Sequence, residues 1–208
     1  MTNRLMPLVA ICVVGIGFAY SQESEKEKAK SASKGLAINQ IVPGPFYPFI
    51  THGSQKDRIR CVINEKAREK LLLIFIQSES VPDFLPESLV ALDANLSKVP
   101  DPLKAVGSAL VVWVNTEIKS IVQDDEKRVK VVEGLRSAIP EGKLQRIVLG
   151  VDDPLDLAEY NLSKDSQIVV ASIDRMNVVA MKSFKEGEAN QKSLTDILLG
   201  MAAGNSGK

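Results

Sequence analysis

The sequence predicts an α/β fold, a three-layer sandwich with a mixed central sheet. Three mostly apolar segments, at residues 71–77, 108–115 and 144–151, are separated by stretches whose leucines and valines recur at helical spacing. Apolar runs of this length are typical of strands that are covered on both faces. Two more apolar segments around a short turn and a last amphipathic stretch follow. These features predict parallel strands joined by helices, then an antiparallel hairpin and a closing helix.

The domain is predicted to open at residues 43–48, because the prolines of PGPFYP exclude regular structure there. Residues 49–63 then predict a hairpin. Apolar Phe49 and Ile50 are followed by a polar turn that contains Gly53. Beyond the turn, apolar and polar residues alternate as in a strand, with the apolar positions at Ile59, Cys61 and Ile63.

Two helices and a closing hairpin complete the order of elements. The first helix is predicted from Glu87 to Pro100, since its leucines recur at helical spacing and a proline ends it. The second begins after the acidic residues 124–126, whose charges suit the positive end of a helix dipole. A turn at residues 174–176 joins the two strands of the closing hairpin. The last helix has an apolar face made of Leu194, Ile197, Leu198 and Met201.

The composition argues against several classes of function. The chain has 208 residues, with 26 basic and 26 acidic side chains and no formal net charge. Nucleic-acid binding is not expected, because there is no excess of cations to displace counterions from phosphates. One histidine and two cysteines leave almost nothing for a zinc site or for a nucleophile with a histidine base. We therefore expect no cofactor and no metal centre.

The N-terminus predicts an export signal at residues 1–21. Arg4 precedes an apolar run from Leu8 to Tyr20, and small residues at Ala19 and Ser21 indicate cleavage after residue 21. The run is shorter than the about 20 apolar residues that a spanning helix needs, so no stable membrane span is expected after cleavage. An uncleaved anchor is the alternative. The mature chain is then exported, to the periplasm or outside the cell.

The rest of the chain divides into three parts. Residues 22–42 predict a solvated linker, because the stretch QESEKEKAKSASKG has no large apolar side chain to offset the entropy of ordering it. Residues 43–203 form the predicted domain. Residues 204–208 are predicted to be a flexible tail.

The order of elements points to a known family. The segments THGSQKDRIR, EKAREK and LLLIFIQ follow one another in the first part, and YNLSKDSQIVVASIDRMNVVAMKSFKEGE forms the later part. This order resembles the thioredoxin-like superfamily, in particular exported members with an N-terminal hairpin before the first core strand. The resemblance covers about Pro43 to Ala203. It implies a thioredoxin-like sandwich, and because it rests on element order it supports a fold more than a chemistry.

The resemblance also implies where a redox centre would lie, and this sequence lacks one there. In thioredoxins a Cys-x-x-Cys pair follows the first core strand at a helix N-terminus, which lowers the thiol pKa. Here residues 78–84 read SESVPDF, without cysteine. Residues 165–168, DSQI, stand where the family has a cis-proline, and a peroxiredoxin-type Pro-x-x-x-Thr-x-x-Cys does not occur. Dithiol exchange at the usual position is therefore excluded.

Cys61 is the remaining candidate for catalysis, since signal cleavage would remove Cys12. Nearby basic side chains favour a thiolate at this position. In the predicted strand, however, Cys61 alternates with Ile59 and Ile63, which predicts a thiol buried in the core as a small hydrophobe. A redox or mixed-disulfide role and an intermolecular disulfide are the alternatives.

Other polar residues are expected to have structural roles. His52 is predicted to lie exposed in the polar turn, since no spacing points to a partner for a catalytic base. The carboxylate pairs Asp124–Asp125 and Asp152–Asp153 are expected in helix capping and solvated turns, with a hard-cation site as the alternative. Trp113, within the second buried strand, is expected in the core.

The family geometry implies a candidate binding rim of five residues, namely Ser80, Pro82, Phe84, Ser166 and Gln167. They fall where thioredoxins bind extended polypeptide, although the apolar ones are equally expected to anchor the loop against the helix. We therefore expect an exported thioredoxin-like domain with a degenerate active site, a non-catalytic binding or structural module. Its expected partner is an extended polypeptide or an exported protein. The alternative is an enzyme, a thiol-dependent oxidoreductase or antioxidant protein in redox homeostasis that works through Cys61.

Overall fold

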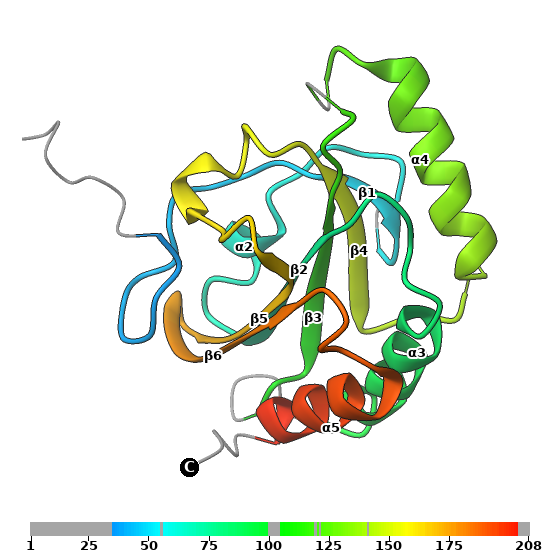
Figure 1. Cartoon of the computed structure of the whole chain (residues 1–208). Helices are drawn as coiled ribbons and strands as arrows, with labels where there is room; N and C mark the ends of the chain where they lie inside the picture. The colour runs from blue at the N-terminus through cyan, green and yellow to red at the C-terminus, as the bar shows by residue number, and fades with distance from the viewer. Residues whose placement is uncertain are drawn as a thin grey trace, which may run out of the picture. The chain divides into compact units, whose positions relative to one another are not determined.

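The computed structural model describes residues 35–54, 56–99, 105–118, 120, 122–140 and 142–203. The predicted signal peptide, most of the predicted linker and the predicted tail lie outside these residues. Within them the chain forms a six-stranded sheet in the order β1-β4-β3-β2-β5-β6 (Figure 1). Its strands are β1 (Phe49–His52), β2 (Lys70–Gln77), β3 (Ser108–Val114), β4 (Ile147–Asp152), β5 (Ser166–Asp174) and β6 (Asn177–Lys185). None of the described helices is long and apolar enough to cross a membrane.

The sheet is mixed, as predicted. Strands β2, β3 and β4 are parallel neighbours, whereas β5 pairs antiparallel with both β2 and β6. The three apolar runs of the sequence correspond to the three parallel strands, and every side chain of β3 and β4 is buried. The turn between β5 and β6 consists of Arg175 and Met176, with φ angles of 47° and 68°. Two consecutive left-handed residues suit a tight hairpin, so this prediction is confirmed.

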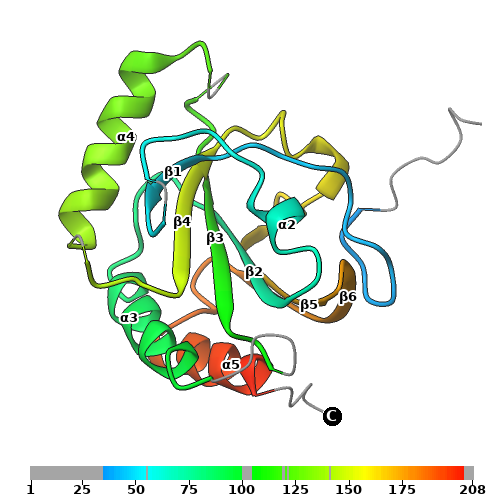
Figure 2. The ribbon, with the colours of Figure 1, turned by 180° about the vertical axis from the view of Figure 1, so that it is seen from behind.

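The long helices share one face of the sheet. They are α3 (Leu85–Leu96), α4 (Asp125–Ala138) and α5 (Gln191–Ala202). Strands β2, β3 and β4 follow one another in one direction across the sheet, so right-handed crossovers place α3 and α4 on the same face. The opposite face is covered by the chain before β1 and by two short helices, α2 (Val62–Glu65) and the 3-10 helix η1 (Ala158–Tyr160) (Figure 2).

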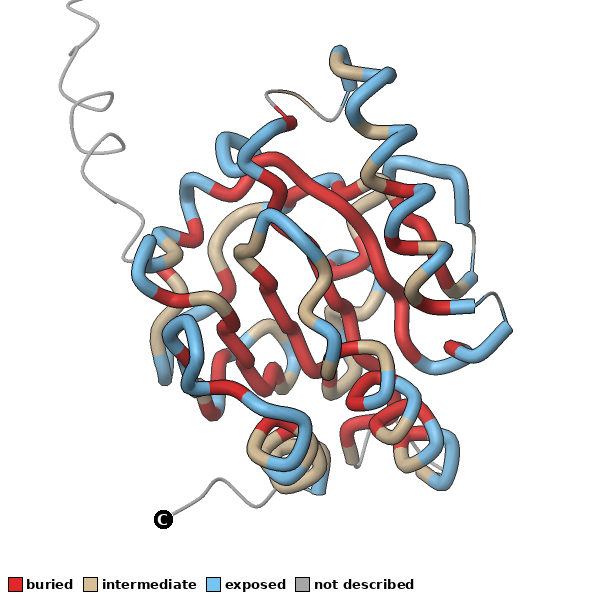
Figure 3. Tube along the Cα trace, turned by 45° about the vertical axis from the view of Figure 1, so that its right-hand side comes forward, coloured by how far each residue is buried: buried red, intermediate tan, exposed pale blue. Residues whose placement is uncertain are grey.

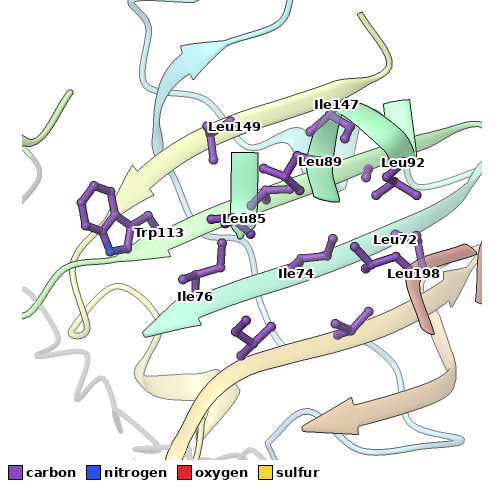
Figure 4. Close-up of a cluster of buried hydrophobic side chains, with 14 of the residues drawn as sticks. Leu72, Ile74, Ile76, Leu85, Leu89, Leu92, Trp113, Ile147, Leu149 and Leu198 are labelled. Atoms are coloured by element: carbon purple, nitrogen blue, oxygen red, sulfur yellow. The ribbon is translucent and has the colours of Figure 1, made fainter. Parts of the chain in front are cut away.

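The core consists of two clusters separated by the sheet. The first cluster joins the sheet to α3, α4 and α5, and includes Leu72, Ile74, Leu89, Trp113, Leu149 and Leu198 (Figure 4). The second cluster lies on the other face, where Phe46, Phe75 and Tyr160 pack their rings together. Along the trace the central strands are buried almost without interruption, while the helices alternate between buried and exposed positions (Figure 3).

The predicted N-terminal hairpin forms, but its second strand is short. Strand β1 pairs antiparallel with β4, while Phe49 and Ile59 form an antiparallel bridge that is flanked by backbone hydrogen bonds of Ile50 with Asp57 and Arg58. Ile59 is 40% exposed, while Val62 and Ile63 are both buried, so the expected alternation does not hold. Two adjacent buried residues suit a helix turn, and the chain forms α2 there. The charged stretch before it lies at the surface, where the N–H of Arg60 donates to the carbonyl oxygen of Pro48 as part of the hairpin.

The predicted linker extends too far towards the C-terminus. Leu36 donates its backbone N–H to the carbonyl oxygen of Tyr160, Asn39 donates to Val178, and Val42 is buried. Gly35 has a φ of 73°, and a Cβ built on it would lie 2.8 Å from the Cβ of Asn161. The apolar residues of 36–42 therefore pack on the domain, which begins at or before Gly35 and not at residue 43.

Candidate binding groove

Two adjoining hollows lie where the parallel strands β2 and β3 end. The polar hollow has a volume of about 810 Å³ and is lined by Ser80, Pro82, Asp165, Ser166, Gln167 and Lys185. The second hollow, called the apolar hollow for its larger share of apolar side chains, has a volume of about 600 Å³ and is lined by Val114, Thr116, Pro154, Leu157, Ala158, Asn161 and Leu162. Both hollows are also lined by Gln77, Ser78, Glu79 and Lys164. Because they share these residues, the two hollows adjoin each other, and together they are called the groove below.

The polar hollow brings together four of the five predicted rim residues. Ser80 and Pro82 come from the loop after β2, and Ser166 and Gln167 from the start of β5. Phe84 does not line it. This side chain is half-buried at the N-cap of α3 and packs against the first core cluster. Its place on the predicted rim is therefore wrong, because the benzyl group anchors the loop to the core.

Hydrogen bonds hold the two walls of the polar hollow. The Gln77 Nε2 atom donates to the carbonyl oxygens of Ser163 and Ser166, at 2.9 Å and 2.8 Å. These bonds join the end of β2 to the start of β5, where the described residues contain no cis peptide bond. Sequence reasoning missed Gln77. The signal was an amide at the end of an otherwise apolar strand.

Trp113 supports the loop after β2 from the neighbouring strand. Its indole Nε1 donates a hydrogen bond of 2.6 Å to the carbonyl oxygen of Ser78, and the Ser78 hydroxyl donates to the Ser80 carbonyl at 2.8 Å. The indole is 5% exposed and belongs to the first core cluster, as predicted. The residue therefore contributes both to the core and to the shape of the groove wall.

The apolar hollow has a buried floor and a polar rim. Val114 and Leu157 are each 3% exposed, and they belong to the second core cluster. Thr116 and Ala158 also line this hollow, and both are exposed. Charged groups stand at the junction with the polar hollow, where Glu79 and Lys164 make no ion pair within the described part of the chain.

Cys61 lines neither hollow. It is a free cysteine at the N-cap of α2, half-buried, and it packs against the second core cluster. The side chain of Cys61 is therefore only partly buried, whereas the sequence predicted a core position. Ile59, which was predicted to share its face of a strand, is exposed. The candidate thiol and the candidate groove are separate features of the molecule.

Asp152 lies in a buried position and not in the solvated turn that the sequence predicted. It is the last residue of β4 and is fully buried. Its Oδ1 accepts the N–H of Asp153, and its Oδ2 is buried without a hydrogen bond of normal geometry. Burial, and then the charge of Asp156, raise the pKa of Asp152 to about 8. No group of three or more metal-ligating side chains occurs among the described residues.

His52 is also buried, so its predicted place in an exposed turn is wrong. Its Nε2 lies 2.7 Å from the carbonyl oxygen of Ile139 and donates to it, while Nδ1 lies 2.9 Å from the Thr51 Oγ1. The imidazole is 4% exposed. It joins β1 to the chain that follows α4, which is a structural role.

Comparisons with known proteins agree with this architecture. No protein-family model matches the sequence, and no characterised protein matches it. The structure of reduced Prx3 from Vibrio vulnificus in complex with hydrogen peroxide is 18% identical, covers 78% of this chain and 99% of its own, and has a TM-score of 0.50. The exposed lipoprotein thioredoxin Etrx1 from Streptococcus pneumoniae is 15% identical over 75% of this chain and 98% of its own, with a TM-score of 0.46. The chain has a thioredoxin-like fold.

Proposed function

We propose that this chain is an exported, non-catalytic module that binds an extended polypeptide in the groove at the ends of β2 and β3. The observation that carries the proposal is the groove's position. The loop after β2 and the start of β5 are where a thioredoxin would carry its dithiol and its cis-proline, and here they form the walls of an 810 Å³ hollow without sulfur. The fold has kept its binding geometry and lost the chemistry.

The dimensions of the groove support a polypeptide as its ligand. Pockets for single small molecules usually measure about 300–1,000 Å³. Two adjoining hollows of about 600 Å³ and 810 Å³ offer more room than one such pocket, with apolar residues in the first and charges of both signs in both. An extended peptide offers apolar side chains, charged side chains and backbone groups in succession. It therefore suits a surface on which the three kinds of contact follow one another.

Export is part of the proposal and rests on the sequence of residues 1–21. A basic residue, an apolar run and small residues at the expected positions are the marks of a cleaved signal. In an oxidising compartment a single free thiol that took part in exchange would readily form mixed disulfides. The half-buried position of Cys61 is consistent with that environment.

A second candidate function is thiol chemistry at Cys61. It is favoured by one observation, that Cys61 is free and only partly covered. The residue would act as a lone nucleophile, without a second thiol among the described residues to resolve a mixed disulfide.

One pair of measurements separates the two functions. The first is binding of fluorescein-labelled, reduced and carboxymethylated α-lactalbumin, a permanently unfolded polypeptide, to the mature chain and to Ser80→Trp. The second is turnover of a protein disulfide and of hydrogen peroxide by the mature chain and by Cys61→Ser. The proposal predicts saturable binding that Ser80→Trp weakens, and no turnover. Turnover that Cys61→Ser abolishes would overturn it in favour of the enzyme.

A control variant keeps the first measurement specific. Ser97→Trp introduces the same side chain at an exposed position beyond the C-terminus of α3, away from both hollows. Binding by this variant is expected to equal that of the unchanged chain. Equal loss in both variants would mean that the added indole acts non-specifically, and the groove would no longer be the binding site.

A further inference from the structure

The hydrogen bonds of His52 fix the number of protons on its ring. The Nε2 atom lies 2.7 Å from the carbonyl oxygen of Ile139, and because a carbonyl can only accept, Nε2 carries a proton. The Nδ1 atom lies 2.9 Å from the Thr51 Oγ1. That hydroxyl donates its single proton to the carbonyl oxygen of Leu149 at 3.0 Å, so it can only accept from the imidazole. Both ring nitrogens therefore donate, as they do only in the imidazolium form.

We propose that His52 is a protonated latch between β1 and the C-terminal end of α4, which rising pH releases. The latch consists of the three hydrogen bonds that His52 and Thr51 make with each other, with Ile139 and with Leu149. When the ring loses the proton of Nδ1, the Thr51 hydroxyl has to turn and donate to that nitrogen. Its bond to Leu149 is then lost, and the bond to Ile139 is no longer assisted by a charge.

The end of α4 favours a positive charge at this position. Ile139 is the C-cap of α4, so its carbonyl oxygen belongs to the negative end of the helix dipole. The imidazole of His52 is 4% exposed, and burial by itself favours the neutral ring. Two charge-assisted hydrogen bonds and the helix end oppose that effect. Since the neutral ring also leaves one of the three bonds unmade, the geometry satisfies the protonated form best.

A β-bulge brings the hydroxyl and the imidazole together. The pairing of β1 with β4 shifts between Ile50 and His52, so Thr51 is an extra residue in the strand. In a regular strand, neighbouring side chains point to opposite faces, and the bulge allows these two to meet. The Thr51 side chain is buried, and its hydroxyl bonds to the carbonyl of Leu149, the residue that is paired with His52.

The charged groups around the latch come from the turn after β1 and from α4. Lys56 lines the same hollow of about 230 Å³ as His52, and it is the only charged side chain among the described residues that line this hollow. Its charge opposes the imidazolium, but it is exposed and therefore screened by the solvent. On the last turn of α4, Arg136 forms an ion pair with Asp57. The residues of β4 that pair with β1, at positions 149–151, carry no charge.

The latch matters for α4 because this helix buries only two of its side chains. Two arginines provide further contacts with β1 and the turn after it. The guanidinium of Arg128 lies 4.9 Å from the centre of the Phe49 ring, and Arg136 makes the ion pair. Arginine keeps its charge at every ordinary pH, whereas histidine titrates near neutrality. Loss of the His52 proton is therefore the step that loosens the end of α4 as pH rises.

Nitrogen NMR of the mature chain, without a histidine tag, tests the protonation directly. His52 is the only histidine of the chain, so its ring signals are unambiguous. At about pH 6 both ring nitrogens should be protonated, and the midpoint of the titration should lie above about 6.5, the ordinary value for histidine. A ring with one unprotonated nitrogen at this pH, or a midpoint below the ordinary value, would overturn the inference.

Two variants of Thr51 distinguish the latch from a histidine with a merely structural role. Thr51→Val keeps the shape of the side chain and removes the acceptor, so the midpoint should fall by about 1 pH unit or more. Thr51→Ser keeps the hydroxyl and should leave the midpoint unchanged. Equal midpoints in the unchanged chain and Thr51→Val would contradict the proposed hydrogen bond. If Thr51→Val does not fold, the nitrogen signals of the unchanged chain decide by themselves.

Amide hydrogen exchange tests the release. The contribution of the latch to stability is fully present below about pH 6.5 and is lost as pH rises through the midpoint measured in the fold. Exchange at residues 136–139, corrected for its intrinsic pH dependence, should therefore speed up above the midpoint. The experiment uses Asp152→Asn, because the pKa of Asp152, about 8, lies in the same range. Adding His52→Gln should abolish the pH-dependent change. Exchange that stays constant across the midpoint would overturn the release even if the ring is protonated.

Discussion

The Gln77 Nε2 atom donates a 2.8 Å hydrogen bond to the carbonyl oxygen of Ser166. This contact joins the end of β2 to the start of its neighbour β5, and both residues line the polar hollow. With its second bond, to the carbonyl of Ser163, the same amide holds the loop that precedes β5. A proline would restrict this loop through its ring, whereas here a side chain restricts it through two hydrogen bonds. The shape of the candidate groove therefore depends on one amide.

Replacing Gln77 by methionine should loosen that wall. The substitution keeps the length of the side chain and removes its amide N–H groups. The carbonyl oxygens of Ser163 and Ser166 then lose the hydrogen bonds that they accept from Gln77. We expect the free energy of unfolding to fall by about 1–3 kcal/mol, measured by urea denaturation. Amide hydrogen exchange should rise at residues 163–167. Gln191→Met is the control, since Gln191 makes one exposed hydrogen bond to Glu87, and its loss should change stability by less than about 0.5 kcal/mol.

The single tryptophan should report on ligand binding. Trp113 is buried, and its indole N–H is bonded to the carbonyl of Ser78 in the groove wall. A ligand that displaces the loop after β2 changes this bond, so the emission of Trp113 should shift as labelled or unlabelled peptide saturates the groove. Trp113→Phe should remove the signal and destabilise the fold by about 1 kcal/mol or more. An emission spectrum that stays constant at saturation would place the ligand elsewhere.

Stability should depend on pH through Asp152. Burial raises the pKa of Asp152 in the fold to about 8, well above the 3.8 of an ordinary aspartate, so the folded chain holds a proton that the unfolded chain releases. Because the pKa is higher in the folded chain than in the unfolded chain, the free energy of unfolding falls as pH rises. The contribution of Asp152 to stability is fully present below the unfolded pKa and is lost as pH rises through the folded pKa. Between pH 4 and pH 8 the loss amounts to at most about 1.4 kcal/mol per pH unit.

Asp152→Asn should remove this dependence. The amide carries no charge at either end of the range, so the variant's free energy of unfolding should vary less between pH 5 and pH 9, as measured by urea titrations. The matched control is Asp196→Asn, at an exposed position of α5, which should leave the pH profile unchanged. If Asp152→Asn and the unchanged chain had parallel profiles, the carboxyl would be ionised in the fold.

Cys61 should be dispensable for binding. It lines neither hollow and packs against the second core cluster, so Cys61→Ala should leave the affinity for unfolded polypeptide within about twofold. A modest loss of stability is expected from the smaller side chain, on the order of 1 kcal/mol. Fluorescence anisotropy with carboxymethylated α-lactalbumin measures the first effect, and urea unfolding the second. A tenfold loss of affinity would connect the thiol to the groove.

The sheet and its helices could be predicted because local signals agree with the global fold. Residues 71–76 and 109–114 are apolar without interruption, and this pattern is typical of strands that are covered on both faces. The absence of cysteine from residues 78–84 is likewise visible in the sequence alone. Four of the predicted rim residues line one hollow because the order of elements brings the loop after β2 next to the start of β5; their role in binding stays a prediction.

The errors concern contacts between segments far apart in the chain. His52 looks like a turn residue beside Gly53, yet the pairing of β1 with β4, about a hundred residues later, buries it. Asp152 stands in an acidic, proline-containing stretch typical of a loop, but β4 extends through it. The apolar residues of 36–42 have no periodic pattern, and only the surface they cover shows their role. The spacing of residues along the sequence does not predict these contacts between distant segments.

The central claim is that the groove binds extended polypeptide while the thiol is unused. The most direct measurement is a titration of isotope-labelled mature chain with carboxymethylated α-lactalbumin, followed by backbone amide chemical shifts. If the polypeptide binds in the groove, we expect the amide chemical shifts to change mainly at residues 77–82, 114–116 and 154–167. The amides around Cys61 should stay unchanged. Shifts concentrated at residues 59–65, or a covalent adduct at Cys61 with a native disulfide substrate, would contradict it.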